Sequence, residues 1–183
     1  MVSSVPYLLS PLQWWAMSEG PKILLAFDGT DQASHAIEYA ARYLRAGIVE
    51  LLTAWEPSAR QAARSVTRVG VQPVGGSEDP AADPAYEEAQ RVCNAGVQHA
   101  ESLGLSARAH LVESATTISS AIIDAAHELD VDVIVTGTRA LTGFRAWWTN
   151  STADQIVRNA GLPVFIVPQE NEDDADNDEA EYF

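Results

Sequence analysis

Short apolar runs alternate with longer amphipathic segments along most of the chain. Aliphatic runs bounded by glycine, proline or acidic residues are typical of strands buried in a parallel sheet. Such runs occur at 22–28, 49–55, 106–112, 131–135 and 162–168. Between them, apolar residues recur every three or four positions, which predicts helices. The predicted helices span 32–45, 85–103 and 116–129, and a further one starts near residue 150.

The order of these elements predicts the fold. Strictly alternating strands and helices indicate one α/β domain, a doubly wound parallel sheet of five strands with helices on both faces. Right-handed crossovers arrange the strands most simply in the order 3-2-1-4-5. The third strand alternates apolar and polar residues, which suits an edge. The chain reverses direction between the first and fourth strands, and ligands bind in the crevice at such a point.

Glycines and capping residues set the ends of the predicted helices. Gly47 is expected to end the first helix and Gly161 the last. Asn150, Ser151 and Thr152 are all competent caps for the start of the last helix.

Helical spacing predicts core-facing side chains at Ile118 and Ile122 in the third helix and at Ala153, Ile156 and Val157 in the last.

The segment 56–84 interrupts the pattern with four prolines and two adjacent glycines. This composition predicts a long connection with one helical piece rather than a hinge between domains. Arg60, Arg64 and Arg68 would share one face of that helix. The role of this arginine stripe stays open between reaching a bound phosphate, facing solvent and docking the acidic end of the chain.

The net charge of −15 is strongly acidic and unevenly placed, because eight acidic residues lie within 170–183. Such a charge argues against nucleic acid and anionic membranes as general partners. Lys22 is the only lysine among 11 cationic residues. An acidic chain depleted in lysine suits a salt-rich cytoplasm, as in a halophilic archaeon, because salt screens the self-repulsion.

Composition divides the chain into three parts. Residues 1–20 lack the basic start and cleavage site of an export signal, so we expect a disordered extension or a start assigned too early, with Met17 as the true start. Residues 21–169 carry the alternating pattern and form the expected domain. Residues 170–183 are expected to be a disordered acidic tail. No run is long enough to cross a bilayer, and we expect a cytoplasmic protein.

Nucleophilic and metal chemistry find little support in the sequence. Cys93 is the only cysteine, which excludes an intrachain disulfide and a cysteine cluster, and its apolar helical surroundings favour a small buried hydrophobe. The histidines show no metal-ligand spacing with one another or with Cys93. We therefore predict no catalytic residue and no metal ligand.

Two loops at the expected crevice carry the candidate binding chemistry. One follows the first strand, and the other joins the fourth strand to the last helix. A loop between a strand's carboxyl end and a helix amino terminus directs backbone N–H groups and a positive dipole end at one point, where an anion binds. Asp28 can accept from ribose hydroxyls, hold Mg²⁺ or cap its own turn. Ser151 can donate to a phosphate oxygen or serve as a plain helix cap.

The chain resembles the universal stress protein family in two stretches, ILLAFDGTDQASHAIEYA and VDVIVTGTRALTGFRAWWTNSTADQIVRNAGLPVFIVP. The resemblance covers 22–168. It implies a stress-response protein with a pocket for an adenine nucleotide, ATP, with or without Mg²⁺. The base would lie near Ala54, the ribose near Asp28 and Thr30, and the phosphates along 137–151. The implied nucleotide-binding residues are Asp28, Gly29, Thr30, Ala54, Gly137, Thr138, Arg139, Ala140, Asn150, Ser151 and Thr152.

The second loop departs from the motif of this family. ATP-binding members carry a glycine, two residues, a second glycine, nine residues, and a third glycine before serine or threonine. Gly137 and Ser151 match the two ends, but Ala140 and Asn150 replace the other glycines. A methyl group at Ala140 crowds a phosphate lying on the main chain, whereas asparagine tolerates left-handed backbone. Trp147-Trp148 are open to core packing, a dimer contact or a plug of the pocket.

Two functions follow from these patterns. The first is a non-enzymatic stress-response protein that binds an adenine nucleotide; the second is a nucleotide-independent homodimeric adaptor with a closed pocket. An enzyme has less support, because the first loop lacks the serine-glycine-glycine phosphate loop of adenylating ligases, although weak ATP hydrolysis stays open. The apolar last strand lies at a sheet edge, which predicts a homodimer through Val164–Val167.

Overall fold

A five-stranded parallel sheet forms the centre of the molecule. The computed structural model describes residues 20–66, 80–138 and 151–168. The strands are β1 (Lys22–Ala26), β2 (Ile48–Trp55), β3 (Ala107–Glu113), β4 (Val133–Gly137) and β5 (Val164–Val167). Their order is β3-β2-β1-β4-β5, which confirms the predicted doubly wound topology.

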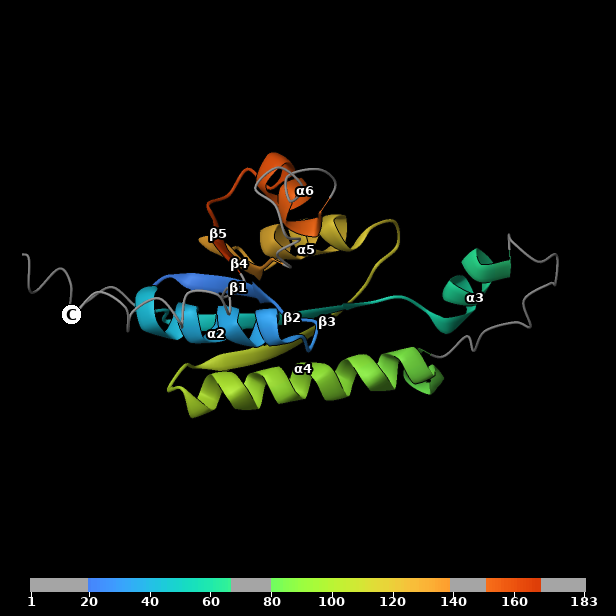
Figure 1. The fold of residues 1–183 in the computed structure, drawn as a ribbon, viewed down its shortest axis with the longest axis horizontal. Coiled ribbons are helices and arrows are strands. Elements are labelled where there is room, and N and C mark those ends of the chain that lie inside the picture. The colour runs from blue at the N-terminus through green and yellow to red at the C-terminus, as the bar shows by residue number, and fades with distance from the viewer. Residues whose placement is uncertain (1–19, 67–79, 139–150, 169–183) are drawn as a thin grey trace, which may run out of the picture.

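Helices cover both faces of the sheet, as Figure 1 shows. On one face, α2 (Asp31–Tyr43) packs against β4 and β5, and α4 (Pro84–Ser102) packs against β2 and β3. On the other face lie α5 (Ile118–Glu128) and α6 (Thr152–Asn159). Within the described parts of the chain, no helix is long and apolar enough to span a membrane.

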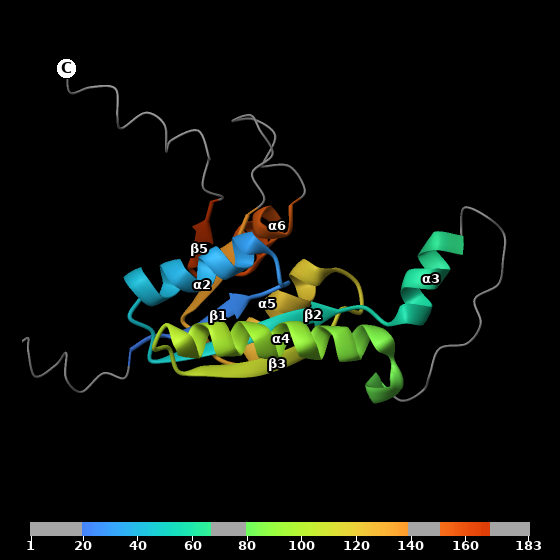
Figure 2. The same ribbon diagram turned by 60° about the horizontal axis from the view of Figure 1, so that its bottom comes forward.

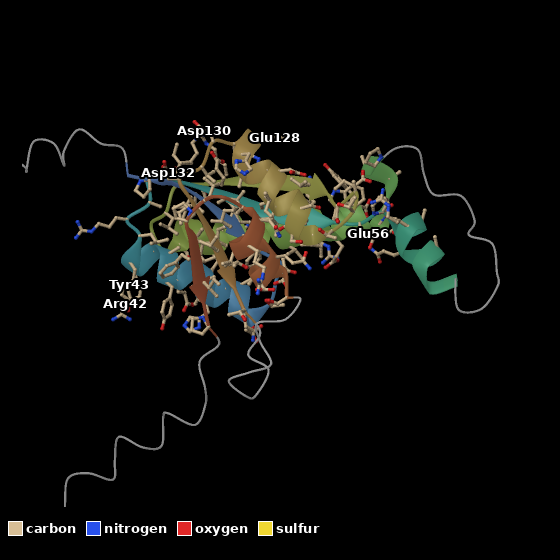
Figure 3. All side chains as sticks on the ribbon, turned by 90° about the horizontal axis from the view of Figure 1, so that it is seen from above. Arg42, Tyr43, Glu56, Glu128, Asp130 and Asp132 are labelled. Carbon is tan, nitrogen blue, oxygen red and sulfur yellow. The ribbon has the colours of Figure 1, made fainter. Side chains whose placement is uncertain are left out.

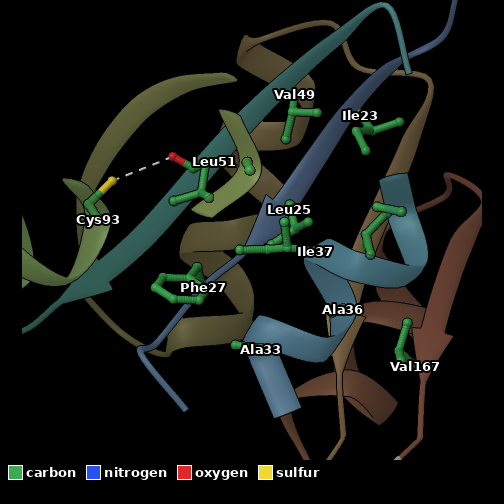
Figure 4. Close-up of a cluster of buried hydrophobic side chains, with 13 residues drawn as sticks. Ile23, Leu25, Phe27, Ala33, Ala36, Ile37, Val49, Leu51, Cys93 and Val167 are labelled. Atoms are coloured by element: carbon green, nitrogen blue, oxygen red, sulfur yellow. Dashed lines mark hydrogen bonds between the residues drawn. The ribbon is translucent and has the colours of Figure 1, made fainter. Parts of the chain in front are cut away.

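Two apolar cores lie on the opposite faces of β1. Ile23 and Leu25 point into the first core, with alanines of α2 and with Cys93 of α4, and Figure 4 shows this cluster. Leu24 points into the second core, against α5 and α6. All three β1 side chains are fully buried. The continuous aliphatic run of β1 is therefore explained by burial on both faces, as expected for a central parallel strand.

Small residues let the helices of the first core approach the sheet. A Cβ atom at Gly96 in α4 would lie 2.6 Å from the Phe27 ring. Cys93, one turn earlier, is 1% exposed, which confirms the prediction of a small buried hydrophobe. Burial raises the pKa of its thiol, which keeps the side chain neutral.

One acidic side chain breaks the apolar pattern of β2. Glu50 is 3% exposed, and its carboxylate lies 2.7 Å from His110 Nε2 and 3.6 Å from Arg108 Nη1 on the neighbouring strand β3. A carboxylate buried in a sheet needs such partners, because an unpaired charge there is costly. The edge strand β3 thus supplies the polar groups that β2 requires.

The ends of the predicted helices are largely confirmed, with shifts that have local causes. Thr117 and Ser151 cap α5 and α6 through their side chains. Gly161 follows α6 in left-handed conformation as expected, with φ of 63°. Gly47 was expected to end α2, but the left-handed residue there is Arg45, with φ of 45°, so the helix stops at Tyr43.

Two predictions of core-facing side chains are wrong. Val157 in α6 is 41% exposed and Ile118 in α5 is 51% exposed. In α6 the buried positions are Ala153, Asp154 and Ile156. Helical spacing identifies a stripe of positions, but it does not show where the neighbouring elements stop covering that stripe.

A helical segment, α3 (Ser58–Val66), stands away from the sheet within the long connection, as the views of Figures 1 and 2 agree. A short turn of 3₁₀ helix, η1 (Pro80–Ala82), precedes α4. Arg60 donates to the carbonyl of Ser114 and lies 3.0 Å from the Glu113 carboxylate. This member of the arginine stripe therefore binds the end of β3, while Arg68 lies outside the described residues.

Asp83 joins the two ends of this connection. Its carboxylate accepts from the Ser58 hydroxyl at 2.5 Å, from the Ser58 amide at 2.9 Å and from the Ala85 amide at 2.9 Å. It thereby caps α4 and holds the start of α3. The Ser58 hydroxyl, followed by the Ala85 amide, lowers the pKa of Asp83 below its ordinary value of 3.8.

This lowered pKa gives a testable dependence of stability on pH. A carboxyl group whose pKa is depressed by folding stabilises the native state above its unfolded pKa, and the contribution is lost as pH falls through the folded pKa. We expect Asp83→Ala to lower the free energy of unfolding at pH 7, with a difference from the natural chain that shrinks below about pH 4. Urea denaturation from pH 7 to pH 3 measures it. Parallel curves for the two chains would contradict the assignment.

Candidate functional site

A cleft of about 580 Å³ opens at the carboxyl ends of the central strands. This is the size of pocket that takes a small organic ligand. It lies where the crossovers after β1 and β4 leave the sheet on opposite sides, which is the predicted crevice. The lining residues come from the strand ends, the loop after β1, and the first turns of α2, α5 and α6.

The first loop is held by a hydrogen-bonded turn. Asp28 Oδ1 accepts from the Thr30 amide at 3.1 Å and from the Thr30 hydroxyl at 2.6 Å. Thr30 in turn caps α2, its side chain accepting from the Ala33 amide at 3.3 Å. The side chain of Asp28 is exposed at the mouth of the cleft. Asp28 thus fulfils the turn-capping alternative and still presents a carboxylate to the cleft.

Two glycines near the cleft serve different purposes. Gly29 has φ of 79°, a left-handed conformation in which a side chain would be strained, and its Cα faces Val92 of α4. Gly137 lies where the backbone of β4 meets α2, and a Cβ atom there would be 2.5 Å from the carbonyl oxygen of Gln32. Gly137 is therefore required by close packing of the two elements that carry the loops.

The helix that follows the second loop, α6, borders the cleft with its first turn. Ser151 caps this helix, its hydroxyl accepting from the Asp154 amide at 3.1 Å. The amino terminus of α6, with its positive dipole end, borders the cleft through Ser151, Thr152 and Ala153. On the β4 side, the Thr138 amide donates to the carbonyl of Val167 at 3.0 Å, which fixes the exit from the strand.

The two ends of the cleft differ in chemistry. On the β2 side, the wall is apolar and consists of Ala26, Leu52, Ala54, Ile118 and Ile122. On the β4 side, the wall carries the hydroxyl groups of Thr136, Thr138, Ser151 and Thr152, together with Gly137 and Ala153. An apolar end next to a hydroxyl-rich end at a helix amino terminus suits a ligand with a flat apolar part and an anionic part.

A hydrogen bond joins the two helices, α5 and α6, whose first turns line the cleft. The Ser119 hydroxyl in α5 donates to Gln155 Oε1 in α6 at 2.5 Å. Ser119 is 4% exposed, so the bond is shielded from water. Because the first turns of both α5 and α6 line the cleft, this contact holds that wall of the cleft together.

The structure brings together most of the predicted nucleotide-binding residues. Seven of them line the cleft: Asp28, Thr30, Ala54, Gly137, Thr138, Ser151 and Thr152. Gly29 shapes the turn without lining the cleft. Arg139, Ala140 and Asn150 lie outside the described residues.

The sequence argument missed the contribution of α5. Ile118 and Ile122 line the cleft, but the hydrophobic pattern placed both simply in the core. Their spacing of four residues at the start of the helix after β3 was the available signal, since that helix begins at the carboxyl edge of the sheet.

Among the described residues, no group of three or more histidine, cysteine or acidic side chains could hold a metal ion.

The role of Gly137 can be tested by substitution. Gly137→Ala places a methyl group against the Gln32 carbonyl, and we expect a loss of about 1–3 kcal/mol in the free energy of unfolding. Gly104→Ala is a useful comparison, because no atom lies within 4 Å of a Cβ there and only left-handed strain of roughly 1 kcal/mol is added. Chemical denaturation measures the free energy of unfolding of both variants. An unchanged free energy of unfolding for Gly137→Ala would show that β4 and α2 are further apart.

Comparison with known proteins agrees with the fold. A sequence model of the universal stress protein family matches residues 21–168. A family protein from Burkholderia pseudomallei has a similar structure, with 24% identity, a TM-score of 0.58, and coverage of 83% of this chain and 98% of that chain. No curated protein matched the sequence.

Two further similar structures are nucleotide complexes. The universal stress protein from Archaeoglobus fulgidus in complex with dAMP is 20% identical, with a TM-score of 0.54, and the match covers 80% of this chain and 96% of that chain. A family protein from Arabidopsis thaliana with AMP bound is 14% identical, with a TM-score of 0.52, and the match covers 88% and 99%. At these identities the likeness shows the fold, while the sequence match over 21–168 assigns the chain. The chain belongs to the universal stress protein family.

Proposed function

We propose that this chain is a stress-response protein that binds an adenine nucleotide in the cleft between the two loops and acts through binding rather than catalysis. The observation that carries the proposal is the cleft itself, with its apolar end at β2 and α5 and its hydroxyl-rich end at the amino terminus of α6. A nucleotide has the matching division into a flat base and an anionic phosphate.

Each part of the nucleotide has suitable groups in the cleft. The apolar end, with Ala54 and Leu52, can cover the faces of a purine. The exposed carboxylate of Asp28 can accept hydrogen bonds from ribose hydroxyls. Ser151 and Thr152 lie at a helix amino terminus, which favours a phosphate. The AMP and dAMP complexes of similar proteins support the same class of ligand for this chain.

A nucleotide-independent adaptor is the second candidate. Asp28 and Ser151 already have partners within the chain, so their positions do not require a ligand. In addition, Ala140 and Asn150 stand where the family motif has glycine. In this alternative the cleft is a remnant of the fold, and the protein signals through protein contacts alone.

Titration calorimetry with ATP and AMP, with and without Mg²⁺ in molar potassium chloride, tests the two candidates. We expect the natural chain to bind with a dissociation constant on the order of micromolar. Ala54→Leu fills the apolar end and should weaken binding about tenfold or more. Ala95→Leu, at an exposed position of α4 on the other face of the sheet, should bind as the natural chain does.

The outcomes separate the candidates. No heat from the natural chain, with binding restored by Ala140→Gly, would identify an adaptor whose pocket has closed. Equal binding by Ala54→Leu and the natural chain would place the nucleotide elsewhere. Incubation of the complex with radiolabelled ATP measures hydrolysis in the same samples, and turnover faster than the buffer blank would contradict a purely binding role.

We also propose that the chain forms a homodimer through β5. This short apolar strand ends the sheet, with no described strand beyond it, and three of its four residues are half-buried. An apolar strand edge tends to pair with another strand. Alongside it, α2 presents Tyr43, which is 54% exposed and carries the Arg42 guanidinium 5.3 Å from its ring centre (Figure 3). α2 contacts β5, so an exposed aromatic residue on the same helix can add to the contact with a second copy.

A charge on the strand edge should prevent this pairing. We expect light scattering in molar salt to give the mass of a dimer for the natural chain and of a monomer for Ile166→Lys at micromolar concentration. Leu103→Lys, at an exposed position after α4, is the matched control and should stay dimeric. A natural chain that is monomeric under these conditions would contradict the dimer.

A further inference from the structure

Ile118 is an exposed aliphatic residue in an unusual place. Four large apolar side chains are exposed among the described residues: Tyr43, Leu103, Ile118 and Val157. Of these, Ile118 alone lines the cleft, although 51% of its surface is exposed. A single exposed apolar residue is ordinary on a protein surface. Ile118, however, lines a cleft of the size that takes a ligand, so a bound ligand can cover its exposed apolar surface.

The residues around Ile118 make an apolar corner. Ile122 lies one turn further along the same helix and is 3% exposed, so it closes the corner from behind. Ala26 and Ala54 come from the neighbouring strands β1 and β2, and their small side chains leave space above the sheet. A planar ring placed over these alanines would meet Ile118 at the side of the cleft formed by α5.

The position of Ile118 is fixed by its helix. It is the first residue of α5, directly after the cap Thr117, and the capping box between Thr117 and Ser120 secures this turn. The next residue, Ser119, is bound to Gln155 of α6. The backbone that carries Ile118 is thus held from both sides, so contact with a ligand requires little ordering.

We propose that Ile118 is a specificity-determining residue of the cleft, which contacts the base and makes the site prefer a purine over a pyrimidine. This inference rests on the proposed nucleotide binding. The two fused rings of a purine present more apolar surface than the single ring of a pyrimidine, so a side-chain wall beside the base gains more from the larger ring. The groups proposed for the ribose and the phosphate are Asp28 after β1 and the amino terminus of α6, so these parts of the nucleotide do not depend on this wall.

Substitution at Ile118 separates base contact from the rest of the site. Ile118→Ser removes the apolar wall, and we expect a five- to tenfold weaker affinity for AMP, the effect of uncovering part of one aliphatic side chain. The affinity for CMP should fall less, so that the preference for AMP shrinks. The affinity for ribose 5-phosphate, which has no base, should stay unchanged.

Two further variants control this experiment. Ile118→Leu keeps an apolar side chain and should retain most of the AMP affinity. If position 118 mattered only for the start of the helix, the affinity would not depend on whether its side chain is apolar. Val157→Ser removes an exposed apolar side chain from α6 outside the cleft and should bind AMP like the natural chain. Thermal melts of all variants should agree closely, because Ile118 and Val157 are both exposed.

Each outcome of the titrations has one meaning. Equal AMP affinity for Ile118→Ser and the natural chain overturns the role of Ile118 and leaves the proposed nucleotide binding intact. An equal loss of AMP and ribose 5-phosphate affinity also overturns it, because the substitution would then act on the whole site. If the natural chain binds none of the three ligands, the proposed function fails and the role of Ile118 fails with it.

Discussion

Burial of β1 on both faces is the constraint on which the rest of the molecule depends. Ile23 and Leu25 point into one core and Leu24 into the other, so helices must cover both sides of the sheet. The chain therefore leaves β1 toward α2 on one side and leaves β4 toward α6 on the other. A space at the carboxyl ends of these strands is the unavoidable result. Alanines at 26 and 54 keep that space open.

The groups around this space also stabilise the elements that carry them. Asp28 orders the turn that starts α2, Ser151 starts α6, and Gly137 lets β4 approach α2. The same hydrogen bonds that cap α2 and α6 also fix the first turns of these helices at the cleft. A site built in this way is preorganised, because its shape follows from the packing of the domain and requires little ordering on binding.

The sequence predicts the sheet well because the relevant signals are local. Aliphatic runs, capping residues and the crossover rule together determine the strands, their order and the position of the cleft. Relationships through space are invisible to such signals. The spacing of Ile118 gives a helix face, but only the position of α5 over the sheet shows that this face ends at the cleft. In the same way, Gly137 looks like a turn residue until the Gln32 carbonyl is seen beside it.

The joint at Asp83 has a consequence for how this protein can change. Ser58 and Asp83 are separated by 25 positions in the sequence, yet their side chains hold each other, so the connection leaves and re-enters the domain at one spot. The entropic cost of closing a loop grows only slowly with its length. Insertions or deletions between these two residues should leave the sheet undisturbed. The joint is therefore a natural attachment point at which a recognition sequence, a tag or a whole reporter domain could be grafted onto the scaffold.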